Sequence, residues 1–550
     1  QPEMIDSLTR LLWGMLWTAV ISGSLLILVS AVFLGELNQD EGWYLYGSRL
    51  ASEGKTPYAD FAYTQGPVMV RAYALAMPLI RGAGVLGGRI LSAFFAVAGF
   101  LFTALLAARL APPGGKKLCA LLALALTGIN VYQCYFCSVV KTYSLTVMLI
   151  SGGLLTLGFA GRKHGNLAVL ASGFLLGLAA GARLTAGAVL PVVFVWLLVS
   201  GFGLGFPRVG YGGAGRGSCF YFLIGAVAAF GLSFGPVLFE DAGNVIFCLA
   251  RYHAGREVSG GLSSLLLKCG SVSRLIGAYS AVFVLLILGA GGGLLRKPSI
   301  GPCESGADES EDRRFSSGLT LVILISAFLM ALAHIAAPFP YDDYQVIVFP
   351  LVVVVVSVML VRLGVELAER SRVVMAAAIA LVSAGMAVSS PVAQGWLVLG
   401  KDRLWVLRRE EAPLRKLQMT GKMLQELAPA GSEILTQDIY LAVETGFSVP
   451  HGFEMGQFSY FPDMSDREAR RRNVVNRKML RDILYGTDAP VAAFSGYGLA
   501  VACPGITELP REEQEDLRGI VAERYRLVEE IQNFGQADTT LRIFELRRED

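Results

Sequence analysis

Residues 35–71 read GELNQDEGWYLYGSRLASEGKTPYADFAYTQGPVMVR, a polar stretch that directly follows an apolar run. It contains five acidic, three basic and six aromatic residues. The adjacent carboxylates of Asp40 and Glu41, followed by aromatic side chains, suit a site that deprotonates and stacks a sugar at a membrane surface. The alternative is a solvated loop with one face of an interfacial helix, formed by residues at i, i+3, i+4 and i+7: Trp43, Tyr46, Gly47 and Leu50. That alternative accounts for the aromatics but not for two acids so close to a bilayer.

The composition places this stretch in a membrane protein. Of 550 residues, 54% are hydrophobic and only 17% are charged, which is too apolar for an ordinary soluble protein. The net charge of +3 decides little, because membrane proteins distribute charge by side of the bilayer rather than by total. The chain is therefore predicted to be an all-α polytopic membrane protein.

A bilayer core of about 30 Å requires about 20 apolar residues as a helix. The runs that meet this requirement predict about eleven transmembrane helices near 11–34, 87–110, 118–136, 141–160, 167–182, 184–204, 219–239, 274–295, 316–337, 345–362 and 372–390. If the N-terminus is cytoplasmic, every inner connection contains at least two Lys or Arg residues, as the positive-inside rule requires. An odd number of spans then places everything after residue 390 outside the cell membrane.

The last part of the chain differs sharply in composition. Charged runs such as 467–472 exclude it from the bilayer. Helical patterns at 403–428, 466–485 and 510–523 alternate with short β-type runs at 433–436, 491–494 and 540–545. We therefore predict two domains: a transmembrane domain over 1–390, with an outer catalytic loop at 35–86, and an extracytoplasmic soluble α/β domain over 391–550.

Several charged or aromatic side chains fall at the predicted outer ends of different helices. The basic ones are Lys141, Arg183, Arg251 and Arg256, and they are accompanied by His253, Glu257 and the group Tyr341-Asp342-Asp343-Tyr344. Charges at a membrane border are costly and are functional candidates by default. Basic groups facing two acids match a phosphate leaving group opposite a general base. The alternative for each basic residue alone is that it extends to the lipid headgroups.

Other motif classes find no support. The four histidines are scattered without an HExxH pattern, so a protease-type zinc site is not supported, and no Walker motif is present. Nothing in the chain indicates nucleic-acid binding.

Two segments of the first loop carry a family resemblance. Asp40-Glu41-Gly42-Trp43-Tyr44 and the later GKTPYADFAYTQGP, residues 54–67, resemble the C-type (GT-C) glycosyltransferase superfamily, in particular its protein mannosyltransferase and lipid A aminoarabinose transferase members. Arg89 resembles the arginine that opens the second span of these proteins, Arg183 falls where many relatives have a lysine, and YDDYQVIVFP resembles a late segment of theirs. Two positions depart from the pattern: Gln65 replaces a lysine, and Lys141 replaces an acid.

The resemblance implies a GT-C fold and an inverting enzyme that takes a sugar from a polyprenyl-phosphate carrier. Asp40 would be the base or would orient the acceptor, with Glu41 beside it as the second catalytic candidate. Donor-phosphate contacts are assigned to Lys141, Arg183, Arg251, Arg256 and Arg89. Substrate contacts are assigned to Tyr44, Tyr58, Asp60, Tyr63, Gln65, His253 and Tyr344. The family pattern specifies no cofactor. The carboxylates of Asp40 and Glu41 could bind a divalent cation.

We therefore expect an integral protein of a bacterial inner membrane whose active site is extracytoplasmic. Its partners would be a polyprenyl-phosphate sugar, membrane lipid, and an acceptor that is a glycolipid, a polysaccharide or a protein. A physical reason supports a lipid donor, since an outer compartment lacks nucleotide sugars. The alternatives are a transporter or flippase of lipid-linked saccharides, which needs polar groups through the bilayer depth, and a non-catalytic scaffold for the outer domain, which has no need of Asp40 and Glu41.

Overall fold

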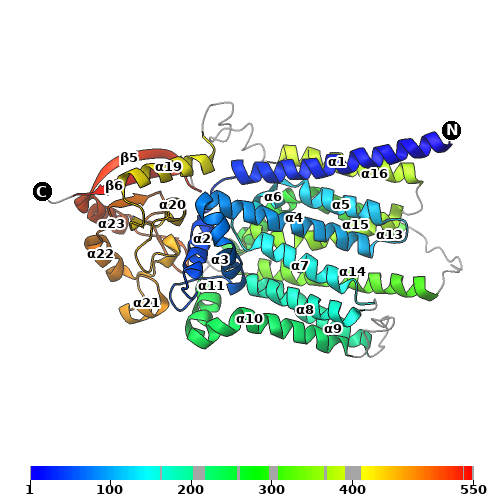
Figure 1. Cartoon of the computed structure of the whole chain (residues 1–550), viewed down its shortest axis with the longest axis horizontal. Coiled ribbons are helices and arrows are strands. Elements are labelled where there is room, and N and C mark those ends of the chain that lie inside the picture. The colour runs from blue at the N-terminus through cyan, green and yellow to red at the C-terminus, as the bar shows by residue number, and fades with distance from the viewer. Residues whose placement is uncertain are drawn as a thin grey trace.

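The computed structural model describes residues 2–161, 164–201, 217–256, 261–295, 307–364, 368–390, 411–536 and 538–547. Long helices run side by side along the longest axis of the molecule, and a smaller unit of helices and strands covers one end of them (Figure 1). The predicted fold class, a helical membrane protein with a C-terminal α/β unit, is confirmed. The predicted boundary after residue 390 adjoins 391–410, which lie outside the described residues.

Seven helical stretches among the described residues are long and apolar enough to cross a bilayer. They are formed by α1 (Pro2–Leu34), α3 with α4 (Pro67–Ile80, Gly84–Leu110), α8 (Gly165–Ala182), η2 with α9 (Leu184–Ala188, Val189–Gly201), α10 with η3 and α11 (Ser218–Ile246, Phe247–Arg251, Tyr252–Ala254), α14 (Ala307–Ala336) and α16 (Glu369–Ser389). These helices account for seven of the expected spans.

The remaining expected spans coincide with bent or shorter helices. The pairs α5–α6 (Lys116–Gly128, Val131–Ser138) and α12–α13 (Leu262–Ala278, Ser280–Leu295) bend by 69° and 82°, and counting each as one span gives nine. The break before α6 has a local cause, because extended Asn130 caps the new helix through a bond from the Gln133 N–H. The apolar helices α7 (Tyr143–Leu157) and α15 (Phe349–Gly364) are shorter than the bilayer core requires. The count of eleven therefore stays a prediction.

The polar stretch after α1 folds into buried structure. It forms α2 (Gln39–Ser52), a turn region, and then α3, followed by the short helix η1 (Arg81–Ala83). Helix α2 begins with a capping box in which Asn38 and Glu41 satisfy each other's backbone N–H groups. Trp43, Tyr44 and Tyr46 are all buried, so the alternative of a solvated, lipid-facing loop is wrong.

The described residues from 411 onward form the smaller unit, which we call the soluble unit. It contains the predicted mixture of helices and strands. Its helices are α19 (Pro413–Leu427), α20 (Ile439–Thr445), η5 (Gly456–Ser459), α21 (Asp466–Arg472), α22 (Arg477–Gly486) and α23 (Arg511–Arg524). A four-stranded sheet has the order β1 (Ile434–Thr436), β2 (Val491–Phe494), β6 (Thr539–Leu546), β5 (Tyr525–Phe534), with only β1 and β2 parallel, and β3 (Val501–Ala502) pairs with β4 (Thr507–Glu508). Strand β5 was not anticipated. The helix expected at 466–485 is two helices, because Asn473 adopts a left-handed conformation between them.

This unit lies directly on the first polar stretch. Helix α2 packs against α20 so closely that a Cβ atom on Gly42 would come within 2.3 Å of the Tyr440 backbone nitrogen. The Gln39 amide donates to Asp438 at 3.0 Å, and an Arg49 Nη atom donates to the Phe447 carbonyl at 2.8 Å. The structure therefore holds the start of α2 between the helix bundle and the soluble unit, and this position creates the candidate site.

Candidate functional site

A cavity of about 480 Å³ lies where the helix bundle meets the soluble unit. Its walls come from the start of α2, the connection between α6 and α7, the end of α8, the η3–α11 region, the segment before α15, and loops of the soluble unit. Eight of the predicted site residues line it: Asp40, Tyr44, Gln65, Lys141, Arg183, His253, Arg256 and Tyr344. Residues from distant parts of the sequence thus converge on one polar hollow.

Asp40 stands in the first turn of α2, and its side chain is 28% exposed. One carboxylate oxygen accepts a bond from the Trp43 indole Nε1 at 3.0 Å. The other oxygen lies 3.0 Å from the ammonium of Lys141. Both oxygens are therefore oriented by neighbours while the group still faces the cavity, as a general base needs.

Lys141 lies in the connection between α6 and α7 and contacts a second carboxylate. Its ammonium is 2.9 Å from Asp343 in the short helix η4 (Asp342–Ile347), and the Tyr143 hydroxyl donates to the same Asp343 oxygen at 2.8 Å. Burial alone would raise the pKa of Asp343, but the charge of Lys141 and the bonds from Lys141 and Tyr143 outweigh it and lower that pKa. Asp343 is therefore held in its charged form, and Lys141 is shared between two acids.

Arg183 follows the last residue of α8 and is held between two aromatic rings. Its guanidinium carbon lies 4.8 Å from the Tyr143 ring centroid and 4.5 Å from that of Tyr344. One Nη atom donates to the Thr142 hydroxyl at 3.2 Å. Arg256, whose guanidinium lies 5.3 Å from the Tyr252 ring, lines the same cavity. Stacking fixes the plane of a guanidinium and directs its edge, which suits a forked contact to phosphate oxygens.

The wall near Asp40 is aromatic. Tyr44 stacks on Trp43 with ring centroids 4.0 Å apart, and both line the cavity. His253 Nε2 donates to the Thr64 carbonyl at 2.9 Å and so fixes the loop that carries Gln65. Flat aromatic faces beside a carboxylate and hydrogen-bonding groups suit a ring-shaped polar substrate such as a sugar.

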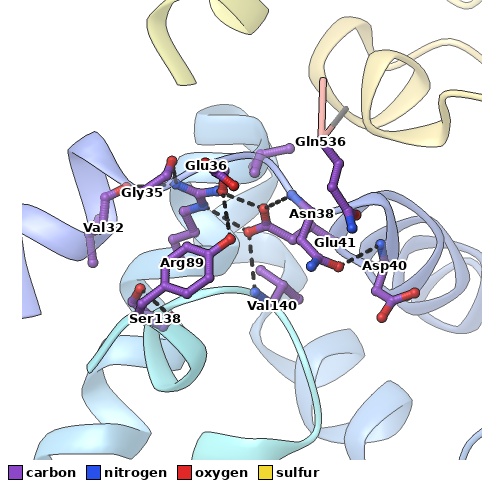
Figure 2. A network of polar contacts seen from close by, with 12 residues as sticks. Val32, Gly35, Glu36, Asn38, Asp40, Glu41, Arg89, Ser138, Val140 and Gln536 are labelled. Carbon is purple, nitrogen blue, oxygen red and sulfur yellow. Dashed lines mark hydrogen bonds and ion pairs between the residues drawn. The ribbon is translucent and has the colours of Figure 1, made fainter. Parts of the chain in front are cut away.

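Glu41 and Arg89 do not line the cavity. Both are fully buried, and the Arg89 guanidinium binds both Glu41 oxygens, at 2.8 and 2.7 Å (Figure 2). The other Arg89 bonds go to carbonyls at the end of α1, those of Val32, Gly35 and Glu36. These bonds engage all five N–H donors of a guanidinium. The assignment of Arg89 to the donor phosphate is therefore wrong, and the buried Glu41 carboxylate cannot meet a substrate in this arrangement.

Four other assigned residues also lie outside the cavity. Arg251 is exposed on η3 and is not one of the residues that line the cavity. Tyr58 and Tyr63 are buried in an aromatic cluster, where the Tyr58 hydroxyl donates to the Gln65 carbonyl at 2.5 Å. Asp60 is exposed and accepts the Thr56 N–H at 2.7 Å, which closes a turn. The contacts of Tyr58, Tyr63 and Asp60 stabilise the loop that follows α2, because this loop folds around its own aromatic side chains. These contacts do not form a substrate-binding surface.

The two neighbouring acids do not fit a shared divalent cation. The Glu41 oxygens accept from Arg89, the Asn38 N–H and the Val140 N–H, whereas the Asp40 oxygens face Trp43 and Lys141. In Figure 2 the Asp40 carboxylate points away from the Glu41–Arg89 pair. Across the part of the chain that the structure describes, no group of three or more His, Cys, Asp or Glu side chains could hold a metal ion. The carboxylates at positions 40 and 41 serve different purposes.

The structure also adds lining residues that the sequence analysis did not assign. Asp343 is the most consequential: the sequence analysis named it within the YDDY motif but assigned a substrate contact only to Tyr344. Tyr143 and Tyr252 also line the cavity, and they lie close in sequence to the assigned residues Lys141 and His253. The soluble unit contributes Gln457, Phe458, Tyr497, Val501, Ile506 and Gln536.

Comparison with known proteins identifies the architecture. No protein-family model and no curated protein sequence matches the chain. Two crystal structures of ArnT from Cupriavidus metallidurans are similar to it. The form bound to undecaprenyl phosphate has a TM-score of 0.59 at 14% identity, and the apo form has 0.58 at 15%. Each alignment covers 96% of this chain and 97% of the other. At such identities the likeness shows a shared fold, over almost the full length of both chains.

Proposed function

We propose that this chain, which has the fold of the C-type (GT-C) glycosyltransferases, moves a sugar from a polyprenyl-phosphate donor to an acceptor at the outer face of a membrane. One observation carries the proposal: a single cavity holds the Asp40 carboxylate together with Lys141, Arg183 and Arg256. A base and several phosphate-binding cations in one hollow are what glycosyl transfer from a lipid phosphate requires. The solved ArnT structure with undecaprenyl phosphate adds support from a protein of the same fold.

In this proposal the acceptor nucleophile lies beside Asp40. Its lone pair attacks the anomeric carbon while its proton passes to an Asp40 oxygen. The bond between the anomeric carbon and the phosphate oxygen breaks, and the electron pair leaves with the polyprenyl phosphate. Attack opposite the leaving group inverts the anomeric carbon.

The cations act on the leaving group. In the proposal, Arg183 and Arg256 neutralise charge that develops on the phosphate; the contacts of Arg183 with the Tyr143 and Tyr344 rings and the place of both arginines in the cavity lining support this role. Lys141 has a double task, since it contacts Asp40 and Asp343 and lines the cavity. The stacked pair Trp43–Tyr44 is placed to bind the sugar ring.

The Glu41–Arg89 pair has a positioning role in this scheme. Glu41 completes the cap of α2, and Arg89 ties it to the end of α1. Asp40 therefore stands on a helix start that is fixed to the membrane helices. An acceptor that is a glycan, a glycolipid or a protein would enter beside the soluble unit, which walls part of the cavity.

The test is a donor panel. The purified protein, reconstituted in liposomes, is incubated with several polyprenyl-phosphate sugars, and the free polyprenyl phosphate formed is measured by mass spectrometry. Glycosyl transfer predicts release from at least one donor. Movement of intact donor between leaflets, without cleavage of any donor, would favour the transporter alternative.

A further inference from the structure

The cavity that contains Asp40 has two chemically different walls. Its charged lining residues, among those that the structure describes, all belong to the helix bundle and its loops. The side that the soluble unit provides, which we call the soluble-unit wall, consists of uncharged residues: Gln457, Phe458, Tyr497, Val501, Ile506 and Gln536. The cations suit a donor phosphate, which leaves the uncharged soluble-unit wall for the acceptor.

Gln457 is the most enclosed polar residue of this wall. It lies in the short helix η5, lines the cavity, and is only 5% exposed. Its backbone carbonyl accepts from the Cys503 thiol at 3.6 Å, whereas its side-chain amide bonds to none of the residues that the structure describes. Buried amides of folded proteins are nearly always hydrogen-bonded. This amide is therefore available to a ligand in the cavity.

The backbone around Gln457 is held in one arrangement. Gly456 has a φ of +60°, and a Cβ atom on it would come within 2.2 Å of the Gln437 carbonyl oxygen, so only glycine fits there. On the other side of Gln457, the Ser459 hydroxyl accepts the Met455 N–H at 3.2 Å. Gln457 is thus positioned before a ligand arrives, as a residue that determines specificity must be.

Gln536 brings a second amide to the cavity from the turn between β5 and β6. Its Oε1 accepts the backbone N–H of Gln39 at 2.9 Å, and Figure 2 shows its side chain beside the start of α2. Gln39 is the chain neighbour of Asp40. The soluble-unit wall therefore adjoins the proposed base, where an acceptor nucleophile has to lie.

Side-chain amides beside aromatic rings suit a saccharide. An amide donates and accepts hydrogen bonds within one plane, and neighbouring hydroxyl groups of a sugar ring also do both. Phe458 and Tyr497 add rings on which the apolar face of a sugar can pack. A charged acceptor would find no counter-charge on this wall. A peptide is usually bound along a strand edge or as a helix in an apolar groove, and neither feature supplies the amides seen here.

We propose that the soluble-unit wall is the acceptor subsite, that it binds the uncharged hydroxyl groups of a saccharide, and that Gln457 determines its specificity. The assignment of this subsite to the acceptor rests on the proposed transfer reaction. Saccharide binding itself does not, because it can be measured without a donor.

Direct binding to the full-length protein in nanodiscs is therefore the test. Calorimetric titrations use uncharged pentasaccharides of glucose, mannose and galactose, together with pentagalacturonate and a serine-rich peptide. At least one uncharged pentasaccharide should bind more tightly than the anionic one and the peptide. Gln457→Leu should weaken that binding about tenfold, the effect of losing one or two hydrogen bonds. Because the amide has no protein partner, this variant should unfold at the parental temperature or above it.

Gln532→Leu is the matched control, since Gln532 is an exposed residue of the same unit outside the cavity. It should change binding by less than about twofold. Equal losses in both variants, tightest binding of the peptide or of pentagalacturonate, or no binding of any uncharged pentasaccharide would overturn the proposal. A lower unfolding temperature of Gln457→Leu would make Gln457 a structural residue instead. Failure of the transfer reaction is recognised separately, by the absence of polyprenyl phosphate release from every donor.

Discussion

The ammonium of Lys141 lies 3.0 Å from a carboxylate oxygen of Asp40. The same ammonium lies 2.9 Å from Asp343, so one cation balances two acids at the edge of the proposed catalytic cavity. The Lys141 and Asp343 side chains are only 10% and 11% exposed. In such surroundings the loss of one partner leaves the other as an uncompensated buried charge. Lys141 therefore links the folding of this region to its chemistry.

Replacing Lys141 should reveal that link. We expect Lys141→Met to lower the free energy of unfolding by about 3 kcal/mol, because Asp343 loses its counter-charge. Lys141→Met/Asp343→Asn should recover part of this loss, since the second change removes the stranded charge. Thermal unfolding of the parent, both single variants and the double variant measures the coupling. Purely additive losses would mean that the two side chains do not form a functional pair.

Arg183 is expected to act on the lipid donor. Its truncation to Ala should lower kcat/KM for the donor by about 10- to 100-fold, the usual effect of losing a charge-assisted bond. Arg251→Ala provides the control, because Arg251 is exposed and outside the cavity. Steady-state kinetics over a range of donor concentrations measures kcat/KM for both variants and the parent. Equal effects of the two substitutions would indicate that Arg183 contacts lipid headgroups at the membrane surface rather than the donor.

Glu41 should prove structural. Glu41→Gln leaves the buried Arg89 guanidinium without a full counter-charge, which should cost about 3–5 kcal/mol of stability. Glu53→Gln, at the C-terminal cap of the same helix and with a 41% exposed side chain, should cost less than about 1 kcal/mol. Thermal unfolding measures both losses, and turnover is normalised to folded protein. A Glu41→Gln protein of parental stability but without turnover would restore Glu41 as a catalytic candidate.

The soluble unit should contribute to acceptor binding through Phe458. This side chain lines the cavity and belongs to residues 451–460, HGFEMGQFSY, whose aromatic residues among glycines make it a candidate acceptor contact from the sequence as well. Phe458→Ala should raise the KM for the acceptor while leaving the KM for the donor unchanged. Tyr485→Ala tests a large exposed side chain of the same unit that does not line the cavity. A parallel rise in both KM values for Phe458→Ala would point to disturbed folding of the cavity wall.

The sequence was informative about where polar groups meet the membrane helices. Asp40, Lys141 and Arg183 each stand at the end of an apolar run, and charge at such a place is visible without a structure. The membrane helices and the α/β unit were predictable for the same reason, because hydropathy and periodicity are local properties. The fold could therefore be anticipated, and eight of the fourteen assigned residues line one cavity.

The sequence could not show which side chains contact each other when they lie far apart along the chain. Arg89 and Glu41 both looked like site residues, yet they neutralise each other inside the protein. Tyr58 and Tyr63 looked like substrate contacts, but the loop buries them against its own aromatic rings. The pairing of Asp343 with Lys141 was not predicted, because nothing local connects the YDDY motif with a lysine far earlier in the sequence. Which charge meets which is decided by the tertiary fold.

Cleavage of the lipid donor by the parent and by Asp40→Asn tests the central claim most directly. Asp60→Asn is the matched control, since it makes the same change in the same stretch but outside the cavity. With a donor that the parent uses, polyprenyl phosphate release should fall by about 10²- to 10⁴-fold in Asp40→Asn, because the general base is lost. Asp60→Asn should retain release close to that of the parent. Release by a well-folded Asp40→Asn protein within a few-fold of the parent would contradict the account.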